Sequence, residues 1–585
     1  MLLSLLLLIS TATWAIAESE SVLVPYQSFI SRPDILAPVL NVRLHDTQSI
    51  SPGYIFLSTW SSDRSSETQN APYIFDNDGE LIYTGYSHSL PTTKYFNFQS
   101  HHFSNHTPVL SVFRGTSNRG RGKGHIGLYD DTYRVIRTIN APDGRDLDFH
   151  EFRLLDDGHT AIVVALRPIE ADLSRFGIRQ GLGWLLDSVF WVLDLADDKT
   201  QVMFEWRASE QIGMEESMLE PSVRGRMAGM SWKYAYDYFH INSIDRFANG
   251  DFLVSARHTD TIYRISGKDR SVLWRLGGKK SSFTLLNFTF SAQHDVKIVQ
   301  ESDDGRRVVV SLLDNAYNGI TKTSNSSSAI VIEVDAERKQ ARLLKRFFPA
   351  SKTLAQNQGS VQHLPDEHTL VSWGLVAEFS EFDQDGTRVL DVAFAESMTR
   401  AYRVQKFDWV GRPDESEIAV YLYARTNDSN VYFWMSWNGA TEVREWRVLR
   451  EDGLVLGVVE WEGFETFFDA GRFVSSGYVE AVGNDGKTLG RSKVVQTLVP
   501  TENMAEVCGD AHCMMQILPS KTAAFDSPAK GQKRPLVSSS SVAWDMSWLS
   551  MASGVVVGLL VSRMRWPTAV CIRAFTALLR KVRAG

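Results

Sequence analysis

Short apolar runs separated by polar turns pattern the chain from about residue 51 to residue 394. In one repeated pattern an apolar run ends in a turn and a second apolar run follows, as in residues 73–83 (YIFDNDGELIY). A second pattern of strand, polar turn and strand alternates with the first, as in residues 152–164 (FRLLDDGHTAIVV). Runs of this length bounded by Asn, Asp and Gly are typical of β-hairpins. Helical periodicity is scarce in this region.

Two such hairpins in each unit predict a four-stranded blade. About six units follow one another, so the pattern predicts a six-bladed β-propeller over residues 45–411. The longest insertions, residues 170–187 and 209–236, flank the third unit. Long ordered loops in propellers lie at a channel mouth, so an insertion here is either a lid or a solvated surface loop.

The pattern changes after residue 411. Alternating runs such as 419–423 (AVYLY), 431–437 (VYFWMSW) and 478–482 (YVEAV) are spaced like the strands of a small sandwich. We therefore predict a fibronectin-like β-sandwich over residues 412–505, followed by a linker over 517–542. The predicted fold class is all-β, and no catalytic residue is expected in the sandwich.

Charge is unevenly distributed. The net charge is -8, yet the ten Lys/Arg and two Asp from Ile517 onward give the C-terminal part +8, which leaves -16 for the rest. An acidic body argues against a nucleic-acid partner. An anionic substrate would have to be met by locally placed Arg and His side chains.

Both ends of the chain predict a membrane protein. Residues 1–17 have the apolar run and small-residue end of a signal peptide. Residues 544–565 predict a transmembrane helix, and the basic residues 566–585 predict a cytosolic tail. A C-terminus lying on the membrane is the alternative. We expect a single-pass type I protein of the secretory pathway or cell surface, with a lumenal or extracellular propeller.

The cysteines and sequons fit that expectation. Cys508 and Cys513 are close enough to close a small disulfide loop in an oxidising compartment, whereas Cys571 stands apart. Four N-x-S/T sequons are candidate glycosylation sites: Asn105, Asn287, Asn325 and Asn427.

Candidate chemistry lies in the propeller. His150, His240 and His294 each open a strand-like run at the same place in three successive units, and Arg257 ends another run. Because the innermost strand of each blade lines the channel, we expect these four side chains to meet and to handle an anionic group.

Other kinds of site are less well supported. Three His can hold zinc, but these are far apart in sequence, and Arg257 would repel the cation, so we predict no metal site and no cofactor. No Gly-x-Ser-x-Gly elbow stands out, and there is no Walker loop or dinucleotide fingerprint.

Several motifs resemble the arylsulfotransferase family, and its fungal secreted or membrane branch more closely: 237–244 (DYFHINSI), 254–258 (VSARH), 274–278 (WRLGG) and 292–295 (AQHD). The similarity runs over about residues 45–500. It implies a six-bladed propeller that moves a sulfuryl group from a phenolic sulfate ester to a phenol without a nucleotide donor. The expected partners are these two small molecules and the membrane.

The resemblance also implies residue roles. His294 matches a transiently sulfurylated nucleophile, His240 and Arg257 match a second His and the Arg, and His150 matches the first His. The residues themselves suggest further roles: Asn242, two residues from His240, would contact the sulfonate, and Tyr238 and Tyr317 would stack on aryl rings or belong to the core. The alternatives are a sulfate-ester hydrolase, in which water replaces the phenol, and a non-catalytic, membrane-tethered extracellular propeller that binds ligands.

Overall fold

The computed structural model describes residues 26–61, 69–90, 92–102, 108–179, 181–196, 200–225, 227–396, 398–508 and 513. Strands dominate this part of the chain, and its α-helices are only α1 (Ala208–Gln211) and α2 (Glu502–Cys508). The all-β prediction is confirmed.

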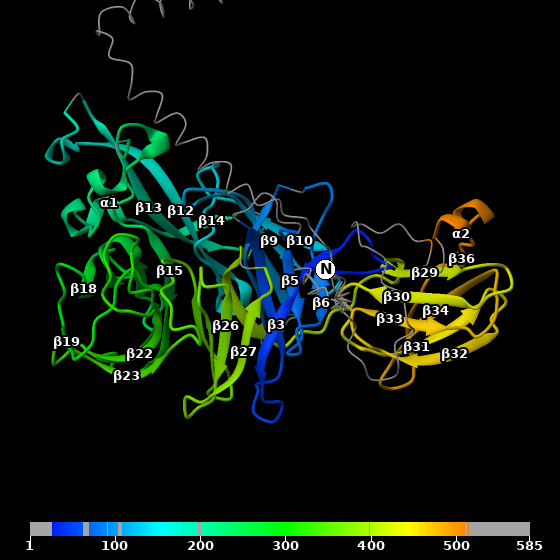
Figure 1. Ribbon diagram of the computed structural model, residues 1–585. Helices are drawn as coiled ribbons and strands as arrows, with labels where there is room; N and C mark the ends of the chain where they lie inside the picture. Colours follow the sequence, from blue (N-terminus) through cyan, green and yellow to red (C-terminus); the bar gives the residue numbers. More distant parts are fainter. Residues whose placement is uncertain are drawn as a thin grey trace, which may run out of the picture. The chain divides into compact units, whose positions relative to one another are not determined.

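Six mainly antiparallel sheets follow one another between residues 40 and 407 (Figure 1). The first three contain the strands β7 (Lys94–His101), β8 (Val109–Asn118), β9 (Arg121–Tyr129) and β10 (Val135–Ile139); β11 (Phe152–Leu155), β12 (Thr160–Ala171), β13 (Gly183–Asp194) and β14 (Gln201–Arg207); and β15 (Ile241–Arg246), β16 (Phe252–Ala256), β17 (Thr261–Ile265) and β18 (Val272–Gly277).

Of the other three sheets, one has an additional short strand, and two combine strands from the beginning and the end of the region. Their strands are β20 (His294–Glu301), β21 (Arg307–Asp314), β22 (Ser328–Asp335) and β23 (Gln340–Phe347) with β19 (Thr284–Leu286); β24 (Ser360–His363), β25 (Thr369–Ser372), β26 (Glu378–Phe382) and β27 (Arg388–Phe394) with β3 (Leu40–His45); and β28 (Thr399–Phe407) with β4 (Tyr54–Ser61), β5 (Pro72–Phe75) and β6 (Leu81–Thr84). The last sheet thus joins the two ends of the region. A separate pair, β1 (Tyr26–Ser28) and β2 (Leu36–Pro38), precedes them.

The first strand of each sheet is tied to the first strand of the next. The bonds that tie them run from Gln99 to the Phe152 carbonyl, Ile244 to Glu151, Val296 to Ser243, Val361 to Asp295 and Val404 to Ser360. The rings of Phe96 on β7 and Tyr402 on β28 pack at 6.1 Å. Inner strands linked in this order surround one axis, which is the arrangement of a β-propeller.

The apolar runs are explained by burial on both faces of each sheet. On β12, Ile162 and Val164 face the core shared with the β15–β18 sheet, whereas Ala161 and Val163 face the core shared with the β7–β10 sheet. Successive strand residues point to opposite faces, so a strand packed on both sides is apolar almost throughout. This packing holds the inner strands in place.

Residues 412–505, the predicted sandwich, form two sheets around one core. One contains β29 (Ile418–Ala424), β30 (Val431–Trp437) and β33 (Glu465–Asp469). The other contains β32 (Val455–Glu460), β31 (Val443–Arg450), β34 (Ser476–Gly483), β35 (Thr488–Arg491) and β36 (Val495–Gln496). Beyond it, a disulfide joins Cys508 and Cys513. Of the candidate glycosylation sites, Asn287, Asn325 and Asn427 are exposed.

The expectation of a single-pass type I membrane protein is corrected. Helices α1 and α2 have four and seven residues, and no helix in the described ranges is long and apolar enough to cross a bilayer. A spanning helix needs about 20 residues. The predicted signal peptide, linker, transmembrane helix and tail, residues 1–17, 517–542, 544–565 and 566–585, lie outside the described residues, as does Asn105.

Candidate active site

The three predicted histidines stand where inner strands begin. His150 and His240 lie just before β11 and β15, and His294 is the first residue of β20. The backbone bends sharply at these entries, since His240 (φ 57°) and Asp295 (φ 52°) are in the left-handed region. Such conformations cost of order 1 kcal/mol for a non-glycine residue and often occur at functional sites.

His150 and His240 form one pair of carboxylate-backed imidazoles. Nδ1 of His240 lies 2.6 Å from Oδ2 of Asp237, and Nδ1 of His150 is bonded to Asp148. The two rings meet edge to face, with centroids 4.8 Å apart. Each carboxylate orients its ring and leaves Nε2 as the nitrogen available to a ligand.

Opposing effects set the ionisation of these pairs. Burial alone would raise the pKa of Asp237, but His240, through its charge and its hydrogen bond, and the Arg224 guanidinium hold it well below its usual value. Burial lowers the pKa of His240, and the Asp237 carboxylate offsets part of that shift. Asp237 therefore stays ionised, and its charge keeps the pKa of His240 higher than burial alone would set it.

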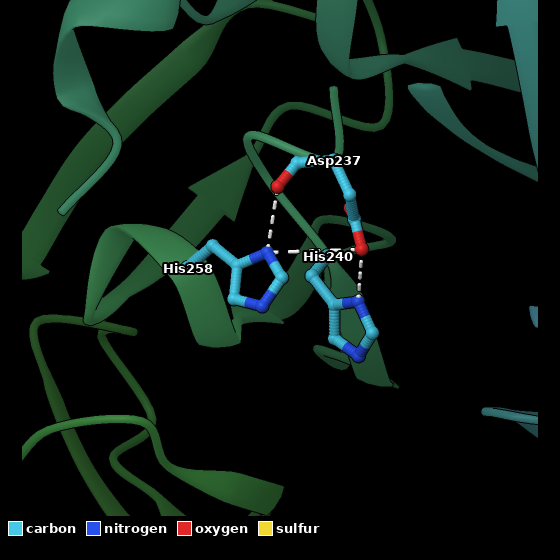
Figure 2. Close-up of side chains that lie close together, drawn as sticks. All are labelled: Asp237, His240 and His258. Atoms are coloured by element: carbon cyan, nitrogen blue, oxygen red, sulfur yellow. Dashed lines mark hydrogen bonds and ion pairs between the residues drawn. The ribbon is translucent and has the colours of Figure 1, made fainter. Parts of the chain in front are cut away.

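His258 lies beside His240, and both rings contact Asp237 (Figure 2). Its Nδ1 donates to the Asp237 carbonyl oxygen at 2.7 Å, and its Nε2 accepts from Arg224 Nη1 at 2.8 Å. Its ring lies 4.5 Å from that of His240. Burial, followed by Arg224, pushes the pKa of His258 well below its usual value, so this ring is neutral.

The cluster of Asp237, His240 and His258 has the composition of a metal site, and its ligand atoms lie within 4.8 Å of one another. Its surroundings do not fit a cation, however. Arg224 occupies the Nε2 lone pair of His258 and lies 3.9 Å from the Asp237 carboxylate. A guanidinium in this position repels a metal ion.

His294 has a different partner. Its Nδ1 lies 2.7 Å from Oδ1 of Asn315 and 3.1 Å from the Ala292 carbonyl, both acceptors, so Nδ1 carries the proton. Nε2 then holds a lone pair, which accepts from the Gln358 N–H at 3.2 Å. Burial and then Arg257 lower the pKa of His294 well below its usual value. His294 is therefore a neutral imidazole.

Arg257 and Asn242 each have a buried polar atom without a hydrogen-bond partner among the described residues. Arg257 follows β16, is 7% exposed, and donates through Nη2 to the Gln356 carbonyl at 2.9 Å. Within the described part of the chain, Arg257 Nε and Asn242 Oδ1 have no hydrogen-bond partner. Burial, and secondly Arg224, lower the pKa of Arg257 to about 10, so it remains cationic near neutral pH. Unpaired buried polar groups are costly, which favours a ligand here.

The structure gives the other three candidate residues, Asn242, Tyr238 and Tyr317, different surroundings. Asn242 donates through Nδ2 to the Gln293 carbonyl at 2.7 Å, so its free Oδ1 accepts hydrogen bonds and does not suit a sulfonate oxygen. Tyr238 is buried in the core, where its hydroxyl donates to the Ile212 carbonyl at 3.2 Å. Tyr317 is half-buried, and its ring packs under Lys322.

An ion cluster lies beneath the histidines. Arg403 on β28 pairs with Glu151 at 2.9 Å and with Asp295 at 3.2 Å, the residues that follow His150 and His294. It also donates to the carbonyls of His150 (3.1 Å) and Asn242 (3.2 Å). Arg403 thus ties three site-bearing strands to one point.

Sequence analysis missed Asp148, Asp237, Asn315, Arg224 and Arg403. A signal existed for the two carboxylates, because Asp stands two or three residues before each of the first two histidines (DFH, DYFH). Asn315 lies 21 residues beyond His294 on the neighbouring strand end. No local motif identifies such a partner.

Comparison with known proteins points to one family. Residues 104–395 match the family model of the arylsulfotransferases (ASST). The matched stretch contains His150, His240, Arg257 and His294, and the match supports the arylsulfotransferase family for this chain. No curated protein is significantly similar to the chain.

Solved structures share little sequence with it. A protein of unknown function from Bacteroides caccae has 12% identity, covers 60% of this chain and 98% of its own, and gives a TM-score of 0.33. A Lactobacillus plantarum protein has 11% identity over 61% of this chain and 99% of its own, with a TM-score of 0.34. The Dos1 propeller has 10% identity over 78% and 97%, with a TM-score of 0.25.

Proposed function

We propose that this chain is a nucleotide-independent arylsulfotransferase, which moves a sulfuryl group from a phenolic sulfate ester to a phenol through His294. The state of His294 carries the proposal: Asn315 holds its Nδ1 proton, Nε2 keeps a lone pair, and the ring is neutral. A neutral imidazole is a competent nucleophile near neutral pH. The motifs at residues 237–244 and 274–278 favour the fungal branch of the family.

In the first half-reaction the Nε2 lone pair attacks sulfur. The sulfur–oxygen bond to the aryl group breaks, and its electron pair leaves on the phenolate oxygen. One of the two carboxylate-backed histidines, His240 or His150, acts in its protonated form and gives that oxygen a proton. The donor phenol leaves, and the sulfuryl group remains on Nε2. The Gln358 N–H, which occupies this lone pair at 3.2 Å, has to release it when the donor binds.

In the second half-reaction the acceptor phenol oxygen attacks the same sulfur. The nitrogen–sulfur bond breaks, its electron pair returns to Nε2, and the phenol proton passes to the histidine that gave one before. Sulfuryl group and proton are both balanced, so the cycle needs no further reactant. The free Oδ1 of Asn242 can accept a hydrogen bond that the phenol hydroxyl donates.

Arg257 supplies a positive charge that complements the negative charge of the sulfuryl oxygens. Its guanidinium has an unused Nε–H beside His294, and a fork of N–H groups binds two oxygens of a sulfuryl group. Such preorganised donors stabilise the charge that spreads over these oxygens as the group transfers.

Labelling tests the proposal directly. The purified chain is incubated with ³⁵S-labelled aryl sulfate and no acceptor, and the protein should retain label on an acid-labile, base-stable bond. Steady-state kinetics should be ping-pong, because donor phenol leaves before acceptor reacts. An active enzyme with sequential kinetics and no label would instead transfer the group directly, with His294 as a base or sulfonate ligand.

A further inference from the structure

The turn between β8 and β9 covers the carboxylate-backed histidines. A Cβ placed on Gly120 would lie 3.4 Å from Cε1 of His240, and the Gly122 N–H donates to the Asp148 carboxylate at 2.6 Å. Arg121 fastens this turn to the 209–236 insertion, since it donates to the carbonyls of Trp232 (3.4 Å) and Ala235 (3.1 Å). These two segments therefore form the rim beside the site.

Cations on this rim lie against aromatic rings. Arg119 is 4.2 Å from the ring centroid of Tyr234, and Lys123 and Lys233 lie 5.9 Å and 5.5 Å from that of Trp232. Trp232 itself is 49% exposed. We call this group of Arg119, Arg121, Lys123, Trp232, Lys233 and Tyr234 the rim patch.

The positive charge of the rim patch is not neutralised locally. Among the described residues, no carboxylate lies within ion-pair distance of its four cations. The nearby carboxylates that act on Arg121, Asp148 and Asp237, are buried against histidines, while Arg224 and Arg119 add like charge. A cationic patch beside a site, on a chain of net charge -8, attracts anions specifically to that place.

We propose that the rim patch binds a second anionic group carried by the aryl substrate, so that the enzyme prefers aryl sulfates bearing a further carboxylate or sulfate. This inference rests on the proposed function. The exposed face of Trp232 suits the aryl ring, and Lys123 and Lys233 beside it suit the additional charge. Contact of the β8–β9 turn with His240 places the patch within reach of the same small molecule.

The experiment compares two donors on the full chain. One is 4-nitrophenyl sulfate, with one negative charge, and the other is 3-carboxy-4-nitrophenyl sulfate, with two. The ratio of their kcat/KM values is measured for the wild type, for K123Q/K233Q, and for K268Q/K339Q. The control removes two other exposed lysines, one of which, Lys339, also lies over an aromatic ring, 5.7 Å from Phe283.

The wild type and the control should prefer the doubly charged donor. In K123Q/K233Q the ratio of the two kcat/KM values should be about tenfold lower. Raising the ionic strength from low to 0.5 M should erode the wild-type preference, because exposed charges are screened. An unchanged ratio in K123Q/K233Q would overturn the inference.

Binding of analogues that cannot react separates this inference from the proposed function. Calorimetry compares benzenesulfonate with 3-sulfobenzoate, whose carbon–sulfur bond is not transferred. Tighter binding of 3-sulfobenzoate that K123Q/K233Q abolishes would support the patch even if no donor were turned over, a result that would refute the sulfotransferase proposal alone. Equal binding of both analogues would refute the patch.

Discussion

The site has two sides that differ in what stands behind the imidazole. On one side His150 and His240 bond through Nδ1 to the carboxylates of Asp148 and Asp237. On the other side His294 bonds through Nδ1 to the amide oxygen of Asn315. All three rings are buried, so the partner and not solvent exposure decides what each can do.

A carboxylate and an amide both orient a ring through Nδ1, but the carboxylate adds a negative charge that favours the protonated ring, and the amide has no such charge. The pKa of His240 is lowered by burial and partly restored by Asp237, whereas burial and Arg257 drive that of His294 well down. The first side is thus built to exchange protons, and the second to offer a lone pair. Single substitutions can test each part of this difference between the two sides.

Removing the lone pair should have the largest effect. His294→Ala should lower kcat by about 10⁴-fold or more, because no other group can take the sulfuryl group. The measurement is donor turnover together with ³⁵S label on the protein. His88→Ala serves as the control, because the His88 ring is exposed and far from His294 in the sequence. Retained label in H294A would show that another residue is the nucleophile.

Arg257→Lys should cost about 10²-fold in kcat/KM. Lysine keeps the charge but loses the fork and the free Nε–H that face the lone-pair side. The control is Arg264→Lys, since Arg264 is 8% exposed and pairs with Asp251 on the outer part of its sheet. A loss in R264K as large as that in R257K would mean that the effect is structural.

Much of this organisation could be predicted from sequence, for a physical reason. Strands packed on both faces need near-continuous apolar runs, so the hairpin units are visible, and residues that open equivalent strands meet at one axis. His150, His240 and His294 were found in this way. The acidic partners follow the same rule, because each stands on the turn that precedes its histidine.

The rest depends on contacts that no local pattern encodes. Asn315 reaches His294 from a strand end 21 residues on, and Arg403 reaches His150 across 253 residues. Tyr238 was predicted either to stack on a substrate ring or to belong to the core, and it lies in the core because of contacts with residues distant in sequence, such as Ile212. The Asn242 amide could be oriented only once the Gln293 carbonyl was placed.

Asp237→Asn gives His240 an amide partner like that of His294, and so tests the difference between the two sides of the site. Asp237→Asn removes the charge that raises the pKa of His240, so that pKa falls further and less of the ring is protonated near neutral pH. The half-reaction that protonates the leaving phenolate should slow by up to about 10²-fold, and the alkaline limb of its pH profile should move to lower pH.

The loss in D237N should depend on the leaving group. It should be small for 4-nitrophenol, which leaves readily as an anion, and larger for phenols of higher pKa. Asp148→Asn should behave alike if both carboxylate-backed rings share the proton. Asp251→Asn, another buried and ion-paired aspartate, is the control. A loss independent of the leaving phenol would argue against acid catalysis by this side.

The smallest expected effect concerns what holds the two sides together. Arg403 bonds the carbonyls of His150 and Asn242, and its ion pairs reach the residues after His150 and His294, so it positions both sides without facing the substrate. Arg403→Lys keeps the charge among Glu151 and Asp295 but cannot make all these bonds. We expect kcat to fall about tenfold with donor KM nearly unchanged, since misplacement affects the transition state more than binding.

Lys406 offers a matched control three residues along the same strand. It forms an equally buried ion pair with Glu381 at 2.6 Å and contacts the Ser51 carbonyl, none of which belongs to the site. Lys406→Met should lower the thermal midpoint, because it leaves a buried carboxylate without its partner, at a cost of about 3–5 kcal/mol, but kcat should stay within twofold when measured well below that midpoint. If R403K and K406M lowered kcat in proportion to their loss of stability, Arg403 would be a folding element and the two sides would need no common anchor. If kcat fell in R403K alone, the spacing between the lone pair of His294 and the proton on the opposite side would be the quantity that Arg403 maintains.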